Sequence, residues 1–88
     1  MQIKTIRVTS LFKKHYRKLP ERVKEEAKKK ELAFRNDPFD STLRTHKLHG
    51  VEKDAFAFWI NYSYRIKFIF LDEKCVLFLD IGSHDIYH

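Results

Sequence analysis

The sequence has 88 residues and a formal net charge of +6, with 43% hydrophobic and 15% aromatic residues. This length and composition predict one globular domain, 1–88, and exclude an arrangement of two domains. The basic excess, with a pI near 9.6, favours polyanionic partners such as RNA, DNA, the ribosome or an acidic protein.

The first half of the chain predicts a strand followed by two helices. Residues 3–8 are β-prone, and Thr9 or Ser10 can cap a helix by accepting a hydrogen bond from an early backbone N–H. Apolar residues then recur at helical spacing on one face: Phe12, Tyr16 and Leu19. Pro20 ends this helix and suits the first turn of a second helix, which is expected to run to about Arg35.

The second half changes to the two-residue period of strands. We predict strands at 43–48, 55–60, 64–71 and 75–81, separated by short turns. Consecutive strands with short turns pair antiparallel. The predicted fold class is α+β, with an N-terminal strand and a two-helix hairpin packed on one face of a mostly antiparallel sheet of about four or five strands.

The register of the last hairpin can be argued from burial. If Phe70 faces Cys75, the apolar residues of both strands share one face under the helices: Ile66, Phe68, Phe70, Cys75, Leu77, Leu79 and Ile81. A slip of one residue would place Asp80 on that face, which is costly. This register predicts that Arg65 lies opposite Asp80 on the other face of the sheet.

The same topology is expected to bring distant residues to one edge of the sheet. Between antiparallel neighbours, the starts of the second and fourth strands lie beside the ends of the third and fifth. That edge would collect Arg44, His46, Trp59, Arg65 and His84.

These residue types can support RNA cleavage without a metal. Histidine titrates near neutrality and can act as a base for a 2′-OH or an acid for a leaving 5′-oxygen, while cations stabilise the phosphate. His46 and His84 are therefore candidates, although each could be an ordinary surface residue. Trp59 could stack an unpaired base or simply pack. No C-x-x-C pair or H-E-x-x-H helix is present, so we expect no metal and no cofactor.

Cysteine content and hydropathy bear on the compartment. Cys75 lies in the apolar run 75–79, so we expect a small core residue there rather than a nucleophile. No apolar run approaches the roughly 18 residues of a membrane span, and the N-terminus lacks the apolar core of a signal peptide. We therefore expect a cytoplasmic protein that does not associate with membranes.

Three segments carry short motifs in a fixed order. They are His-Lys-Leu-His-Gly at 46–50, Asn-Tyr-Ser-Tyr-Arg-Ile at 61–66 and Leu-Asp-Ile-Gly-Ser-His-Asp-Ile-Tyr at 79–87. A K-L-x-G turn, a Y-R-I strand and a closing I-G-[ST]-H-D segment resemble those of the RelE/ParE superfamily of type II toxins. The resemblance spans essentially the whole chain and implies a compact α+β fold with an N-terminal helical hairpin.

The resemblance also implies a function and roles for particular residues. RelE-type members cut mRNA in the ribosomal A site and are held inactive by a co-expressed antitoxin, which should be acidic. Arg65 resembles the arginine expected to contact the scissile phosphate, and His46 and His84 resemble two active-site histidines of YafQ-like members. We therefore expect His46, Arg65 and His84 to be catalytic. Substrate contacts are expected from Arg44, Lys47, Trp59, Lys67 and Tyr87.

The chain departs from the YafQ-like pattern in the middle of the sheet. Where those toxins have a further histidine and an acid, this chain has Trp59 and Ser63. Two other functions stay open: a ParE-like inhibitor of DNA gyrase with the same fold, and a toxin-like binding module without activity. His46 and His84 favour the nuclease, because ParE-type chains need no histidine at the C-terminal position. Which histidine is the base and which the acid is left open.

Overall fold

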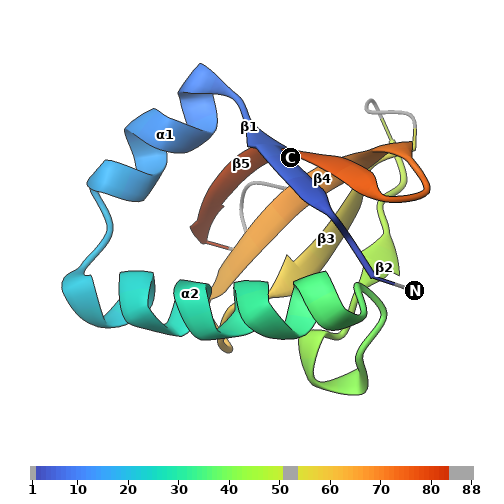
Figure 1. Cartoon of the computed structure of the whole chain (residues 1–88). Coiled ribbons are helices and arrows are strands. Elements are labelled where there is room, and N and C mark those ends of the chain that lie inside the picture. Colours follow the sequence, from blue (N-terminus) through green and yellow to red (C-terminus); the bar gives the residue numbers. More distant parts are fainter. Residues whose placement is uncertain (1, 51–53, 84–88) are drawn as a thin grey trace.

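The computed structural model describes residues 2–50 and 54–83. Its elements, in chain order, are β1 (Thr5–Val8), α1 (Ser10–Arg17), α2 (Glu21–Asn36), the 3-10 helix η1 (Ser41–Leu43), β2 (His46–Lys47), β3 (Phe56–Trp59), β4 (Tyr64–Asp72) and β5 (Cys75–Ser83). The strands form one sheet in the order β1-β5-β4-β3-β2, with β1 parallel to β5 and the other neighbours antiparallel. Figure 1 shows both helices at one side of this sheet. The predicted α+β fold is confirmed.

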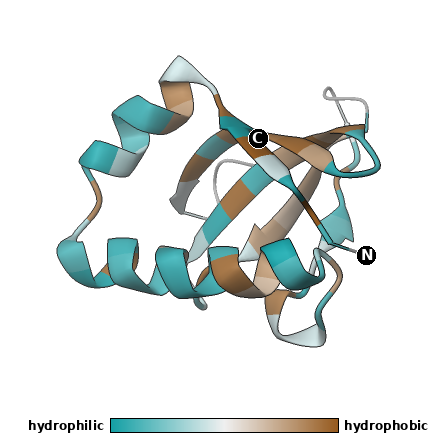
Figure 2. Ribbon diagram, in the orientation of Figure 1, coloured by the Kyte–Doolittle hydropathy of each residue, from teal (hydrophilic) through white to brown (hydrophobic). Residues whose placement is uncertain are grey.

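The core lies between the helices and the central strands and is rich in phenylalanine. Phe34 of α2 is fully buried, and its ring centroid lies 4.7 Å from that of Phe58 on β3. The same ring lies 4.9 Å from Phe68 on β4 and 5.5 Å from Phe78 on β5. The ring centroid of Phe12 on α1 lies 5.5 Å from that of Phe78, so both helices pack on the same face of the sheet. Figure 2 shows the contrast between the largely hydrophilic α2 and the more hydrophobic strands.

A bulge in β5 changes the register that the sequence predicts. Phe68 pairs with Phe78, whereas Lys67 pairs with Asp80, so Leu79 is the extra residue on β5. An extra residue shifts the alternation of side chains between the two faces of a strand. Phe78 and the residue three positions later, Ile81, can therefore both be buried in the core.

The predicted hairpin register is wrong for this reason. Val76 and Phe78 occupy the core, while the residues predicted there are only partly buried: Cys75, Leu77 and Leu79. Arg65 lies opposite Gly82, and Asp80 lies opposite Lys67. The burial argument failed because it assumed an unbroken alternation along β5.

Helix α1 holds the bulge through hydrogen bonds. Thr9 caps α1 by accepting from the Phe12 amide at 3.0 Å, as predicted, and its hydroxyl donates to the Leu79 carbonyl at 2.7 Å. His15 Nδ1 lies 2.6 Å from Asp80 Oδ1. The carbonyl that the bulge removes from the regular ladder is thus satisfied by the start of α1.

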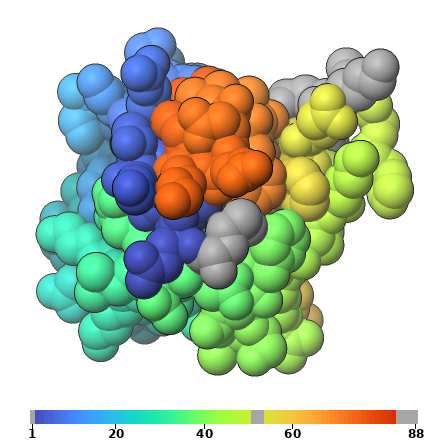
Figure 3. All heavy atoms as spheres, turned by 45° about the vertical axis from the view of Figure 1, so that its right-hand side comes forward, coloured from blue at the N-terminus to red at the C-terminus, as the bar shows by residue number. Residues whose placement is uncertain are grey.

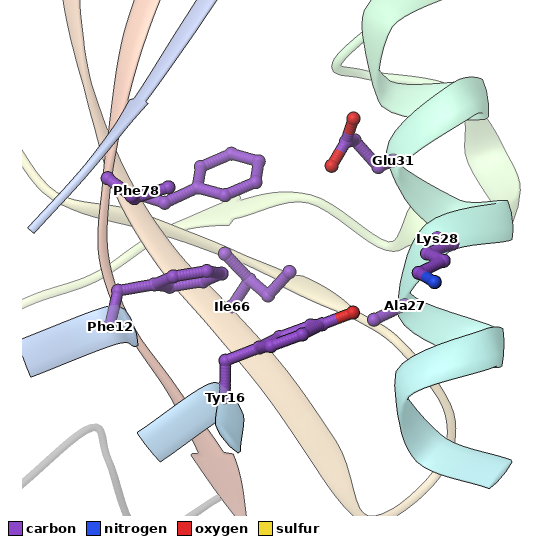
Figure 4. Close-up of a pocket in the computed structure, with 8 residues that line it drawn as sticks. Phe12, Tyr16, Ala27, Lys28, Glu31, Ile66 and Phe78 are labelled. Carbon is purple, nitrogen blue, oxygen red and sulfur yellow. The ribbon is translucent and has the colours of Figure 1, made fainter. Parts of the chain in front are cut away.

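The two helices diverge from their connection and leave an apolar pocket between them. Its volume is about 350 Å³. Figure 4 shows the lining residues, which come from both helices and from the strands beneath: Val8, Phe12, Tyr16, Ala27, Lys28, Glu31, Ile66 and Phe78. No helix among the described residues is long and apolar enough to cross a membrane.

The N-terminal segment ties the two ends of the core together. The Ile3 amide donates to the Arg35 carbonyl at 2.8 Å, and the amides of Lys4 and Thr5 donate to the Lys74 carbonyl at 2.8 and 3.0 Å. Figure 3 shows this segment lying against the tip of the β4–β5 hairpin. The last residues of α2 and the β4–β5 turn are therefore joined through residues 3–5, which lead into β1.

The connection from α2 to β2 differs from the strand predicted at 43–48. Asp40 caps η1, with one carboxylate oxygen accepting from the Thr42 amide at 2.9 Å and from the Thr42 hydroxyl at 2.6 Å. Leu43 is fully buried, and Arg44 after it adopts a left-handed backbone with φ of 51°. Only His46–Lys47 pair as a strand. The burial of Leu43 in a tight turn takes precedence over its strand propensity.

Truncating the central core residue is expected to be severe. Phe34→Ala should lower the free energy of unfolding by roughly 3–5 kcal/mol, because it removes ring contacts to three strands and leaves a cavity. Leu32→Ala on the same helix is the control, since Leu32 is 70% exposed and should change stability by at most about 0.5 kcal/mol. Urea unfolding measures both. Equal effects of the two variants would contradict the assignment of the core.

The capping carboxylate of Asp40 makes a pH-dependent contribution to the free energy of unfolding. Hydrogen bonds from the hydroxyl and amide of Thr42 hold the pKa of Asp40 below its ordinary value of 3.8. The stabilisation is therefore complete above pH 3.8 and is lost as the pH falls through the lowered pKa. Thr42→Val should raise the pKa of Asp40 towards its ordinary value, whereas Ser41→Ala should leave it unchanged. NMR titration of the carboxyl group tests this, and an unchanged pKa in Thr42→Val would contradict the cap.

Candidate functional site

The site lies on the sheet face opposite the helices, which we call the distal face. Paired residues of neighbouring strands project to the same side of a sheet. His46, Ala57 and Lys67 pair across β2, β3 and β4, and Trp59 pairs with Arg65 one row further along. These rows alternate with the core rows that contain Phe58 and Phe68. The distal face is therefore defined by His46, Ala57, Trp59, Arg65 and Lys67.

Arg65 is the one charged residue that is buried among the described residues. Its side chain is only 6% exposed. Its Nη1 donates to the carbonyls of Asn61 and Tyr62 at 2.8 Å each and to that of Tyr64 at 3.2 Å. Its guanidinium carbon lies 3.9 Å from the centroid of the Trp59 ring. Three carbonyl oxygens and an aromatic ring thus replace the water that this charge loses.

The turn between β3 and β4 is held in shape from both sides. Asn61 Oδ1 accepts from the amides of Ser63 and Tyr64 at 2.8 and 2.9 Å. Asn61 Nδ2 donates to Glu26 of α2 at 2.9 Å. Sequence reasoning assigned this segment to a turn but missed Asn61 as its organising residue. The signal was available, because asparagine side chains commonly bond to the backbone two residues ahead.

Arg44 approaches the same aromatic ring from the end of η1. Its guanidinium carbon lies 4.7 Å from the Trp59 ring centroid, and the residue is exposed. Its position follows from its neighbours, because Leu43 is fully buried and Thr45 donates a hydrogen bond to the Pro38 carbonyl. Two guanidinium groups therefore share one indole ring. One is buried in the turn and the other faces solvent.

His46 is oriented by the residue two positions before it. Its Nδ1 lies 2.9 Å from the carbonyl oxygen of Arg44. A carbonyl can only accept a hydrogen bond, so Nδ1 must carry a proton in this contact. In the neutral ring, the lone pair then lies on Nε2. The arrangement sets the chemistry of each nitrogen of His46.

The structure brings together four of the five residues expected at this edge and separates one expected substrate contact from them. Arg44 lies over Trp59, which pairs with Arg65, and the neighbouring row contains His46 and Lys67. Lys47 pairs with Phe56 in a core-face row and lies 4.0 Å from Asp54 Oδ1, so it is not grouped with them. His84 and Tyr87 lie outside the described residues. Ser83, the last residue of β5, pairs with Tyr64 at the start of β4.

Aromatic residues extend the site beyond the cations. Tyr62 is 83% exposed and lies edge-on to Trp59, with ring centroids 6.0 Å apart. An exposed tyrosine in a turn that is held by Arg65 and Asn61 is a fixed apolar surface. Such rings can stack unpaired bases.

The comparisons with known proteins agree on the fold. No protein-family model and no curated protein sequence matches the chain. Among solved structures, a YoeB/ParE toxin from Agrobacterium tumefaciens superposes with a TM-score of 0.78 at 13% identity, covering 92% of this chain and 99% of that one. YafQ in the E. coli DinJ–YafQ toxin–antitoxin complex gives a TM-score of 0.75 at 18% identity, covering 98% and 97%.

A third structure adds sequence similarity. In the intact E. coli RelBE toxin–antitoxin complex, the matched chain is 27% identical with a TM-score of 0.70, covering 90% of this chain and 94% of that one. The motifs at 46–50, 61–66 and 79–87 resemble the same superfamily. The fold is that of the RelE/ParE superfamily of type II toxins, and the sequence motifs resemble the same superfamily.

Proposed function

We propose that this protein is the toxin of a type II toxin–antitoxin system and that it inhibits translation by cutting mRNA on the ribosome. The observation that carries the proposal is the cluster of Arg44, His46, Trp59 and Arg65 on the distal face. It combines a group that transfers protons, cations for a phosphate and an aromatic ring beside an exposed tyrosine. The net charge of +6 adds a general attraction to RNA.

The proposed reaction uses groups of the chain alone. A base takes the proton of a ribose 2′-OH, and the 2′-oxygen forms a bond to the adjacent phosphorus. The bond from phosphorus to the 5′-oxygen breaks, and an acid gives its proton to that oxygen. The products are a 2′,3′-cyclic phosphate and a 5′-hydroxyl end. Arginine side chains stabilise the charge that develops on the phosphate.

His46 and His84 are the proposed acid and base, and Arg65 is the proposed catalytic cation. The contact of His46 Nδ1 with a carbonyl supports this role, because it places the lone pair of the neutral ring on Nε2. The Nη1 of Arg65 is committed to three carbonyls. A phosphate would therefore have to meet the rest of its guanidinium. Lys67 and Tyr87 remain proposed substrate contacts, as do Arg44 and Trp59, whereas Lys47 lies in a core-face row and is no longer proposed.

Cleavage should depend on the histidines. In a translating extract, His46→Ala and His84→Ala should each slow mRNA cleavage by roughly 10²–10⁴-fold, the usual contribution of a general acid or base. Arg22→Gln is the control, because Arg22 is exposed on α2, away from the distal face. Primer extension maps the cuts. Undiminished cutting by His84→Ala would remove that residue from the mechanism.

The same extract separates the nuclease from the gyrase inhibitor. Intact mRNA together with inhibition of DNA supercoiling by purified gyrase would contradict the proposal and favour the ParE-like alternative. Neither effect, together with normal growth on expression, would identify a binding module without activity.

The proposed partner is a co-expressed acidic antitoxin that contacts the helix pair. Helix α1 contains Lys13, Lys14 and Arg17 and no acidic residue. The pocket between α1 and α2 is apolar and lies beside this basic helix. An acidic amphipathic segment matches both features, because its charges meet α1 while one apolar side chain enters the pocket.

Filling the pocket should block this partner without affecting catalysis. Ala27 lines the pocket and is 4% exposed, so Ala27→Leu would project into the space. We expect this variant to cleave mRNA normally and to lose co-purification with the proposed acidic antitoxin. Leu32→Ala on the exposed side of α2 should retain it. Unchanged co-purification with Ala27→Leu would exclude the pocket as the contact.

A further inference from the structure

Trp59 links the two guanidinium groups of the site, and they differ in accessibility. Arg65 is 6% exposed and its Nη1 already donates to three carbonyls. Arg44 is exposed and lies over the same ring at 4.7 Å. A phosphate that approaches from solvent therefore meets Arg44 more readily than Arg65. The ring restrains a side chain that would otherwise be a flexible surface cation.

The backbone of Arg44 performs a second task. Its left-handed conformation, with φ of 51° and ψ of 39°, is unusual for a residue other than glycine. In this conformation its carbonyl oxygen lies 2.9 Å from His46 Nδ1. The side chain of Arg44 thus reaches Trp59 while its main chain reaches His46. One residue connects the cation of the site to its histidine.

We propose that Arg44, restrained on Trp59, is the residue that binds the phosphate of single-stranded RNA, and that its carbonyl positions His46 with Nε2 as the reacting nitrogen. The inference rests on the proposed function for the class of substrate. It adds a division of labour: Arg44 binds the phosphate that arrives from solvent, while Arg65, besides its proposed catalytic role, orders the turn and supports Trp59. The role of Trp59 is to hold a cation, which differs from stacking on a base.

The binding test uses a short 2′-O-methylated single-stranded RNA, which cannot be cleaved through its 2′-oxygen. Arg44→Asn removes the charge while asparagine tolerates a left-handed backbone. We expect about tenfold weaker binding and a slope of log affinity against log salt that is smaller by about 1. Arg44→Lys should bind between the two, because lysine keeps the charge and loses the planar stacking group. Arg22→Gln is the control for a charge removed elsewhere. Equal binding by Arg44→Asn and the wild-type protein would overturn the proposal.

A double-mutant cycle separates the clamp from base stacking. If Trp59 acts by holding Arg44, then Trp59→Leu combined with Arg44→Asn should weaken binding little more than either change alone. If Trp59 stacks on a base independently, the two effects should multiply, which would overturn the clamp. Tyr62→Ala provides the matched cycle with Arg44→Asn. Tyr62 contacts Trp59 edge-on, and its effect should multiply with that of Arg44.

The positioning of His46 has a readout that does not depend on activity. Two-bond ¹H–¹⁵N NMR should show neutral His46 with its proton on Nδ1 in the wild-type protein and in Arg44→Asn, which keeps the carbonyl in place. Arg44→Val should lose this preference, because a β-branched residue resists the left-handed conformation. If Arg44→Val does not fold, the wild-type spectrum still decides. A neutral His46 protonated on Nε2 would overturn the positioning role.

The two proposals can fail separately. Normal mRNA cleavage by Arg44→Asn would refute the role of Arg44 and leave the nuclease standing. A second outcome is that Trp59→Leu and Arg44→Asn weaken RNA binding together no more than either change alone, while the wild-type protein does not cleave mRNA. This outcome would refute the nuclease and leave the role of Arg44 and Trp59 in RNA binding standing.

Discussion

The burial of the Arg65 charge is the constraint on which the distal face depends. A guanidinium that is 6% exposed requires compensation, and it obtains this from three carbonyls of residues 61–64 and from the indole of Trp59. These contacts fix the turn between β3 and β4 and the orientation of the ring. The ring in turn holds Arg44, whose carbonyl orients His46. The residue on which the arrangement of the site depends, Arg65, is therefore itself largely inaccessible to solvent.

The two faces of the sheet have separate tasks. The helix face carries the phenylalanine cluster around Phe34, which supplies the apolar burial that so short a chain needs. The distal face carries the cations and the histidine. Polar contacts among the described residues connect the layers: Asn61 reaches Glu26 of α2, Thr9 at the start of α1 binds the bulge at Leu79, and His15 of α1 contacts Asp80.

Much of this arrangement could be predicted from the sequence, and the failures have physical causes. The order of elements follows from the change in periodicity near the middle of the chain, and the site edge follows from antiparallel pairing. The register of β5 does not, because the bulge at Leu79 is stabilised by Thr9, far away in sequence. The left-handed backbone of Arg44 also could not be predicted from the sequence, since it results from the burial of Leu43 and the hydrogen bond from Thr45 to the Pro38 carbonyl. The sequence also contains nothing that distinguishes the buried Arg65 from a cation on the surface.

The central claim is that RNA binds the distal face of the sheet. The most direct measurement is a structure of the protein on a ribosome whose A-site codon carries 2′-O-methyl groups, which block cleavage. The account predicts that the distal face lies against the mRNA, with Arg44 on a backbone phosphate and His46 Nε2 beside a 2′-oxygen. A ribosome complex in which the protein binds through α1 and α2 and the distal face contacts no RNA would contradict it.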